Sequence, residues 1–71
     1  MNLIHMRINN WAINGMAYLE PDGRYVAAFS ANECREGVWW PPAVERALET
    51  DFASEAEALA AIAVIASSTY G

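Results

Sequence analysis

The sequence contains no lysine, a single histidine and a single cysteine. All four of its positive charges are arginines, and they are scattered along the chain. Because nucleic-acid binding needs grouped basic side chains against the phosphates, this pattern argues against direct contact with nucleic acid. Nine acidic residues bring the formal net charge to −5. Since complementary charge speeds the encounter of two proteins, we expect a protein partner with a basic surface.

The lone cysteine, Cys34, excludes a disulfide within the chain. Secreted chains of this size usually depend on several disulfides. The N-terminus also lacks the order of charges and apolar residues that marks a signal peptide. The longest uncharged apolar run, residues 58–66, is much shorter than the about 20 residues that span a bilayer. These features predict a cytoplasmic protein that makes no contact with a membrane.

No catalytic or cofactor motif occurs in the sequence. Cys34 would act as a nucleophile only beside a base such as His5, and nothing in the sequence places the two together. One cysteine and one histidine do not form the paired spacing of a metal site. We therefore expect a protein that is not an enzyme and has no catalytic residues, no metal and no cofactor.

A chain of 71 residues allows one domain, residues 1–71, and a hydrophobic content of 55 % argues against disorder. A single core in so short a chain rarely contributes more than about 3–5 kcal/mol. No disulfide or metal site is available to add to this. We therefore expect oligomerisation or a bound partner to stabilise the fold, and we predict a homodimer.

The first part of the chain has the pattern of an antiparallel meander over residues 3–30. Residues 3–8 alternate between apolar and polar, residues 9–10 suit a turn or a bulge, and residues 11–13 resume a strand. Asn14-Gly15 predicts a two-residue hairpin turn, because a type I′ turn needs positive φ at both central positions. Pro21-Asp22-Gly23 predicts the next turn, which pairs Glu20 with Arg24.

These two turns set a register that places Trp11 opposite Tyr18, and Tyr18 opposite Val26. Both faces of the resulting sheet are apolar, whereas a sheet with one wet face shows polar alternation. One face is expected to carry Trp11, Ile13, Met16, Tyr18, Val26 and Ala28, and the other Ala12, Ala17, Leu19, Tyr25, Ala27 and Phe29.

The C-terminal part predicts a helix from Ser54 to Tyr70. Ser54 suits the N-cap and Glu57 completes a capping box. Because apolar residues surround this segment on every side, we expect a helix that is buried all round. It should cover the sheet face that bears Ala12, Ala17, Leu19 and Phe29.

Glycine and proline make residues 31–42 look irregular, and residues 43–50 fit a short edge strand and a helix equally well. The predicted fold class is α+β: a three-stranded antiparallel β-meander, with a fourth short strand or a helix at residues 43–50, packed against one C-terminal α-helix.

Two features suggest a binding surface. Trp39-Trp40-Pro41-Pro42 concentrates tryptophan, which is enriched at binding hot spots, although the two indoles would equally well cover the exposed sheet face. Five of the nine acidic residues follow position 44, where they serve helix capping and solubility or form a patch that docks on a basic groove. The predicted partner-binding residues are Trp39, Trp40, Glu45, Glu49, Asp51, Glu55, Trp11 and Tyr18.

The stretch EPDGRYVAAF at residues 20–29, followed by FASEAEAL at residues 52–59, resembles small HicB-like domains. In that family a hairpin with an acidic-Gly turn precedes a helix that opens with a Glu-Ala pair. The Pro-rich, Gly-Cys segment of the family's third strand is absent here. The resemblance implies a hairpin-plus-helix fold and the role of an antitoxin subunit in a toxin–antitoxin system.

In size and acidity alone, the chain is also similar to phage-encoded anti-CRISPR inhibitors. The expected function is that of a small acidic, non-enzymatic protein-binding module that inhibits a basic or nucleic-acid-handling partner. The alternative is a HicB-like antitoxin subunit.

Overall fold

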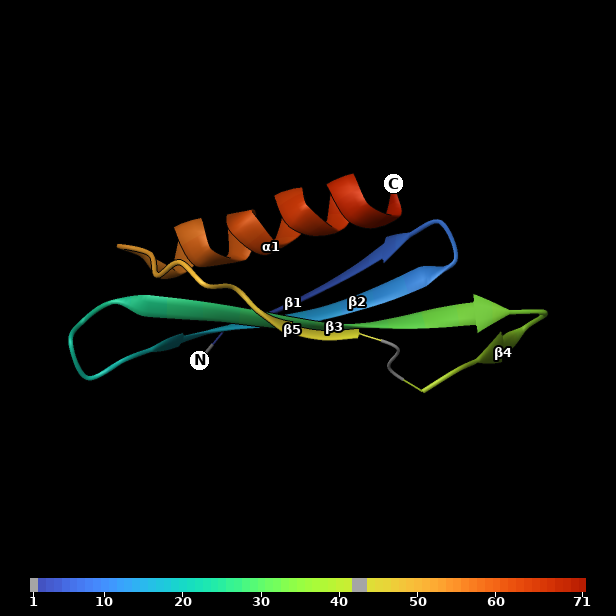
Figure 1. Cartoon of the computed structure of the whole chain (residues 1–71), viewed down its shortest axis with the longest axis horizontal. Coiled ribbons are helices and arrows are strands. Elements are labelled where there is room, and N and C mark those ends of the chain that lie inside the picture. The colour runs from blue at the N-terminus through green and yellow to red at the C-terminus, as the bar shows by residue number, and fades with distance from the viewer. Residues whose placement is uncertain (1, 42–43) are drawn as a thin grey trace.

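The computed structural model describes residues 2–41 and 44–71. One antiparallel sheet forms a single layer, and one helix lies along one of its faces (Figure 1). The predicted α+β class, with a meander followed by a C-terminal helix, is confirmed. The elements in chain order are β1 (Asn2–Ile8), β2 (Trp11–Leu19), β3 (Tyr25–Arg35), β4 (Val38–Trp39), β5 (Val44–Ala47) and α1 (Glu55–Tyr70).

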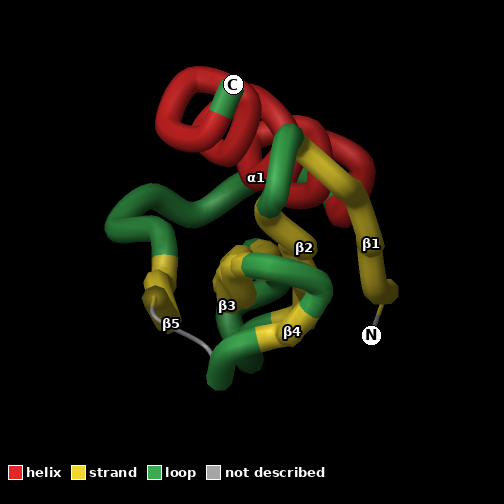
Figure 2. Tube along the Cα trace, turned by 90° about the vertical axis from the view of Figure 1, so that its right-hand side faces the viewer, coloured by secondary structure: helices red, strands yellow, loops and turns green. Residues whose placement is uncertain are grey.

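The chain returns along the free edge of β3 after the meander of β1, β2 and β3. β4 pairs with the last two residues of β3, and β5 pairs with residues 28–31 in its middle. Beyond β5, Phe52 exchanges two backbone hydrogen bonds with Tyr25, of 2.8 and 2.9 Å. Figure 2 shows the result: β1 and β5 lie on opposite sides of the central pair β2 and β3, and α1 lies over one face.

The first hairpin turn is formed by Asn9 and Asn10, so the hairpin predicted at Asn14-Gly15 is wrong. Ile8 pairs directly with Trp11, and Asn9 takes the positive φ of 53° that asparagine tolerates better than most residues. Asn14 and Gly15 lie inside β2 and pair with β1 on one side and β3 on the other. The glycine serves the close approach of α1 rather than a turn.

Because residues 14–15 form no turn, the side chains in the first part of β2 face the side of the sheet opposite to the predicted one. Successive side chains of one continuous strand alternate between the two faces. Trp11 and Ile13 therefore lie on the helix side with Ala17, and Ala12 lies on the opposite side. The predicted placement of these first residues is wrong, and Trp11 pairs with Ile8 and Glu33 rather than Tyr18.

The second predicted turn is confirmed. The backbone N–H of Glu20 donates to the carbonyl of Arg24 at 2.8 Å, and Tyr18 pairs with Val26. The later residues of β2 and the start of β3 therefore lie on the predicted faces. The side chain of Arg24 pairs with Asp51 rather than with Glu20.

The segment expected to be irregular is mostly regular. β3 continues to Arg35, and a tight turn follows at Glu36 and Gly37, which have φ values of 52° and 79°. Positive φ at both positions is the type I′ geometry that suits a hairpin. Residues 44–47 form a strand rather than a helix, and the predictions for Pro42 and Ala43 lie outside the described residues.

The predicted N-cap Ser54 of α1 is present, and the return bond of Glu57 goes to the residue before the cap instead of to the cap itself. The backbone N–H of Glu57 donates to Ser54 Oγ at 3.2 Å, and Glu57 Oε2 accepts from the N–H of Ala53 at 3.3 Å. The expectation of burial all round is wrong, because the helix has a single sheet as its neighbour. Ala58, Ile62 and Ala66 face the sheet, and Val64 is exposed.

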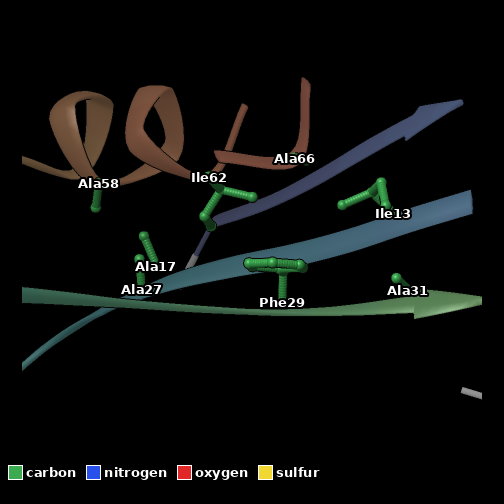
Figure 3. Packing of buried hydrophobic residues seen from close by; sticks show 8 residues of the cluster. All are labelled: Ile13, Ala17, Ala27, Phe29, Ala31, Ala58, Ile62 and Ala66. Atoms are coloured by element: carbon green, nitrogen blue, oxygen red, sulfur yellow. The ribbon is translucent and has the colours of Figure 1, made fainter. Parts of the chain in front are cut away.

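The core lies between α1 and the sheet and is built mainly from alanine (Figure 3). Small side chains on both layers allow the helix to approach the strands closely. Among the described residues, three larger side chains are fully buried with them, and partly buried side chains such as Trp11 and Phe52 pack around this centre. The buried residues are Ile13, Ala17, Ala27, Phe29, Ala31, Ala58, Ile62 and Ala66.

Candidate functional site

The sheet face opposite α1 has no covering layer in the described part of the chain (Figures 1 and 2). We call it the open face. Paired residues of adjacent strands lie on the same face, so the strand register defines its members. They are Leu3, His5, Arg7, Ala12, Asn14, Met16, Tyr18, Val26, Ala28, Ser30, Asn32, Cys34, Trp39, Glu45 and Ala47.

Apolar and polar rows alternate across the open face. One row runs Leu3, Met16, Ala28 and Ala47, and Leu3 is 59 % exposed. The neighbouring row runs His5, Asn14, Ser30 and Glu45. In that row His5 Nδ1 donates to Asn14 Oδ1 at 2.5 Å, because an amide oxygen only accepts.

A hollow of ≈ 530 Å³ lies over these two rows. The small side chains of Ala28 in β3 and Ala47 in β5 leave this space. Leu3 and Met16 line the same hollow, so bulky and small apolar groups are neighbours on one face. The hollow is wide enough to receive side chains from another molecule.

The two tryptophans lie at one end of the sheet, where they stay 45 % and 51 % exposed. The guanidinium of Arg7 lies 4.6 Å from the ring centre of Trp39, and that of Arg35 lies 5.7 Å from the ring of Trp40. Both are cation–π contacts. They hold the indoles at this end, and the row that contains Leu3 remains open.

The opposite end of the molecule gathers acidic side chains. The turn between β2 and β3, the segment after β5 and the first turn of α1 all lie there (Figure 1). Asp51 Oδ1 accepts from Arg24 Nη2 at 3.0 Å and from Nε at 3.2 Å, which links the turn to the segment before the helix. We call this region the acidic end; its charged residues are Glu20, Asp22, Arg24, Glu49, Asp51, Glu55 and Glu57.

Six acids and one arginine give the acidic end a formal charge of −5, which is the net charge of the whole chain. The other three acids and three arginines cancel one another. The molecule is 44 Å long and only 19 Å wide. This length is several times the distance of about 8 Å over which charges act at physiological salt. A partner therefore interacts with the negative end and the neutral end separately.

The structure brings some of the predicted partner-binding residues together and separates others. Glu49, Asp51 and Glu55 meet at the acidic end, and Tyr18 lies beside them on the open face. Trp39 is the last residue of β4, which lies at the opposite end (Figure 1), and Trp40 follows it.

The two remaining predicted residues lie apart from both ends. Glu45 is on the edge strand β5, opposite Ser30 of β3. Trp11 faces the helix side and packs on Tyr70, with ring centres 4.6 Å apart.

Sequence reasoning did not include Glu20, Asp22 and Glu57 in the site. They reach the acidic end because the β2–β3 turn and the start of α1 fold to the same place. The predicted Pro-Asp-Gly turn and capping box were the available signals. What the sequence did not reveal is that these two local features are neighbours in space.

Two further features of the described residues concern metal sites and membrane-spanning helices. Within residues 2–41 and 44–71, no three side chains of the metal-binding types come together as a possible ion site. Nor does the described part of the chain contain a helix with the length and apolar character needed to cross a membrane.

Comparison of the chain with protein-family models, with curated proteins and with solved structures gives no match. What the protein binds must therefore be inferred from its own surfaces.

Proposed function

We propose that this protein is a small acidic, non-enzymatic binding module that docks its acidic end on the basic surface of a nucleic-acid-handling protein and inhibits it. The observation that carries the proposal is the collection of the entire net charge at one end of an elongated molecule. A groove that normally holds nucleic acid is lined with positive charge to neutralise phosphates. Clustered carboxylates offer such a groove an alternative anionic ligand.

Apolar side chains accompany the acids. Directly before the turn that carries Glu20 and Asp22, Leu19 is 60 % exposed on the helix side of the sheet and Tyr18 is exposed on the open face. Binding sites on proteins commonly combine an apolar or aromatic centre with a polar rim. The acidic end therefore provides both the charge that attracts a basic partner and the apolar contacts that hold it.

The tryptophans form a separate surface in this proposal. Trp39 and Trp40 lie at the neutral end, where Arg7 and Arg35 cover part of each ring. A partner that touched both ends would have to extend along the 44 Å length of the molecule. We therefore assign the main contact to the acidic end.

The role of a HicB-like antitoxin subunit remains the second candidate. The hairpin of β2 and β3, with its Pro21-Asp22-Gly23 turn, packs against α1, which begins at Glu55. A hairpin followed by a helix is the order of elements that the resemblance implies. In this case the partner is a toxin encoded by a neighbouring gene, and co-expression of the two genes should yield a complex that purifies as one species.

Two variants with the same change in net charge test the main proposal. Glu20→Gln with Glu49→Gln neutralises two acids at the acidic end, and Glu33→Gln with Glu36→Gln neutralises two at the other end. Asp51 stays unchanged because it pairs with Arg24, and Glu57 because it accepts from the N–H of Ala53 at the helix start. In the control, Glu33 loses its pair with the exposed side chain of Arg35, and such surface pairs contribute little to stability.

Affinity capture from a lysate of the source cell provides the measurement. We expect the wild type and the Glu33/Glu36 variant to retain the same basic protein, and the Glu20/Glu49 variant to lose it. Equal capture by both variants would show that the acidic end is not the binding site.

A further inference from the structure

β1 forms one edge of the sheet, and in the described part of the chain no strand pairs with its outer side. Directly before β2, the carbonyl of Asn10 accepts from the N–H of Cys34, so the even-numbered residues of β2 direct their backbone groups to β3 and the odd-numbered ones to β1. The register of β1 then turns its own even-numbered residues inward to β2. The backbone N–H and C=O groups of Leu3, His5 and Arg7 therefore point outward from the sheet.

This edge lacks the features by which proteins usually keep an edge strand from pairing with another chain, such as a very short strand, a proline, a lysine or a bulge. β1 has seven residues that pair with β2 without interruption, and none of them is proline or lysine. Its one charged side chain, Arg7, lies over Trp39 on the open face. β5 has only four residues, two of them charged, and β4 has two. Among the described strands, β1 thus offers the longest unprotected edge.

The side chains on the helix side of β1 are also incompletely covered. Ile4, Met6 and Ile8 pack against the core but remain partly exposed, whereas Ile13 and Ala17 on the neighbouring strand β2 are buried. Figure 2 shows that β1 is the outermost strand on its side of the sheet. A further strand beside β1 would pair its backbone groups and cover this apolar row at the same time.

We propose that this further strand is β1 of a second copy of the chain, so that the protein is a homodimer whose two sheets join edge to edge. His5 is the middle residue of β1 and one of the outward-facing residues. A two-fold axis beside it pairs His5 with its counterpart, and Leu3 with Arg7 of the partner subunit, in both directions. Each of these hydrogen-bonded pairs exchanges two bonds.

The symmetry of β1 favours a second copy over a foreign strand. With the axis beside His5, every residue from Asn2 to Ile8 has a partner, whereas an axis beside Ile4 or Met6 would leave residues at the strand ends unpaired. A foreign strand would have to match the length and the polar and apolar alternation of β1 by its own sequence. A second copy has both and is present whenever the chain is present.

The two copies also fit on the helix side of the joined sheet. Ile4 lies opposite Met6 of the partner subunit, at a position between hydrogen-bonded pairs where side chains are closest. α1 packs on β1, β2 and β3 and is thus centred over β2. The two β2 strands are three strand spacings apart, about 14 Å. Packed helices need only about 8–10 Å between their axes, so the two helices do not collide.

The charges favour the same arrangement. β1 contains no acidic residue, and Arg7 lies opposite Leu3 rather than another cation. Because the two β1 strands run antiparallel, the two acidic ends point in opposite directions, separated by much more than the screening distance of about 8 Å. Both acidic ends remain free for a partner, so this inference does not depend on the proposed function.

Sedimentation of the complete chain tests the proposal. We expect a species of twice the 7.8 kDa chain mass at micromolar concentration. His5→Pro removes the central outward N–H and none of the bonds between β1 and β2, at the kind of edge position where proline is tolerated, and should weaken dimerisation at least tenfold. His5→Ala removes the same side chain but keeps the N–H, and should leave the dimer intact.

A proline on the opposite edge is the second control. The N–H of Leu48 donates inward to Ala27, so the N–H of Ala47 points away from β3. Ala47→Pro should therefore leave the dimer intact. An undiminished dimer in His5→Pro would contradict the proposal, and so would a dimer lost in Ala47→Pro alone.

A measurement on the wild type does not depend on any variant being folded. In a mixture of isotope-labelled and unlabelled chains, the Hα of Ile4 should show a nuclear Overhauser contact to the Hα of Met6 of the partner subunit, because the backbones approach most closely there. A chain that stays monomeric up to millimolar concentration would overturn the proposal. A dimer without this contact would also overturn it, since its interface would lie elsewhere.

Discussion

Gly15 of β2 lies against Ile62 of α1, so close that a β-carbon at Gly15 would be 3.0 Å from Ile62 Cδ1. The same atom would lie 2.9 Å from Ile4 Cγ2. Real β-carbons essentially never approach as closely as the 2.9 Å to Ile4, and the 3.0 Å to Ile62 is tighter than nine in ten of their contacts. The absence of a side chain at residue 15 is therefore what allows the helix to rest on the sheet.

Substitution of Gly15→Ala is expected to lower the free energy of unfolding by about 1–3 kcal/mol, the usual cost of forcing an extra carbon into a packed core. Urea denaturation followed by circular dichroism measures the change. Ile62→Val removes Cδ1 and should relieve part of the clash. The double variant is then less destabilised than the sum of the two single variants. Strict additivity would show that the two residues do not press on each other.

The N-cap provides a second test of the fold. Ser54→Ala removes the oxygen that accepts from the N–H of Glu57, and should cost about 1 kcal/mol of stability. Ser68→Ala, in the exposed last turns of the same helix, is the control and should have little effect. If thermal unfolding shows the same midpoint for both variants, the capping box does not contribute to stability.

The sequence predicted the local features of this fold and missed those that depend on distant residues. The Pro21-Asp22-Gly23 turn and the Ser54 cap are determined by neighbouring residues, and both were predicted correctly. Asn14-Gly15 has the composition of a turn, but its glycine is needed for contact with Ile62, far along the chain. The strand at residues 44–47 exists because it pairs with β3, which its own residues do not encode.

Prediction of the candidate site from the sequence was limited in the same way. Uneven charge along the sequence indicated an acidic patch, and the structure adds Glu20 and Asp22 to it from a different hairpin. The tryptophans were expected to act together with the acids, and the structure places them at the opposite end. Only the folded chain shows which charges share an end.

The two ends of the molecule are expected to differ in their importance for partner binding. Leu19→Ala should weaken partner affinity about tenfold or more, because Leu19 lies beside the acids and is exposed. Trp39→Ala should change it much less. Neither side chain is buried, so both variants should fold, and isothermal titration with the captured partner compares them. A larger loss for Trp39→Ala would move the binding site to the neutral end.

Association with the partner should depend on ionic strength. Opposite charges on two proteins accelerate their encounter, and salt screens this attraction. We expect the association rate to fall as sodium chloride is raised, and the dissociation rate to change less. The Glu20→Gln/Glu49→Gln variant should show a shallower salt dependence in surface plasmon resonance. The same slope for variant and wild type would mean that the acidic end does not guide association.

Competition with nucleic acid tests the central claim most directly. The captured partner is bound to a fluorescent oligonucleotide, and increasing amounts of this protein are added while anisotropy is followed. The wild type is predicted to displace the oligonucleotide, the Glu20→Gln/Glu49→Gln variant to need a much higher concentration, and the Glu33→Gln/Glu36→Gln variant to match the wild type. A stable ternary complex of the partner with both the oligonucleotide and this protein would contradict the account.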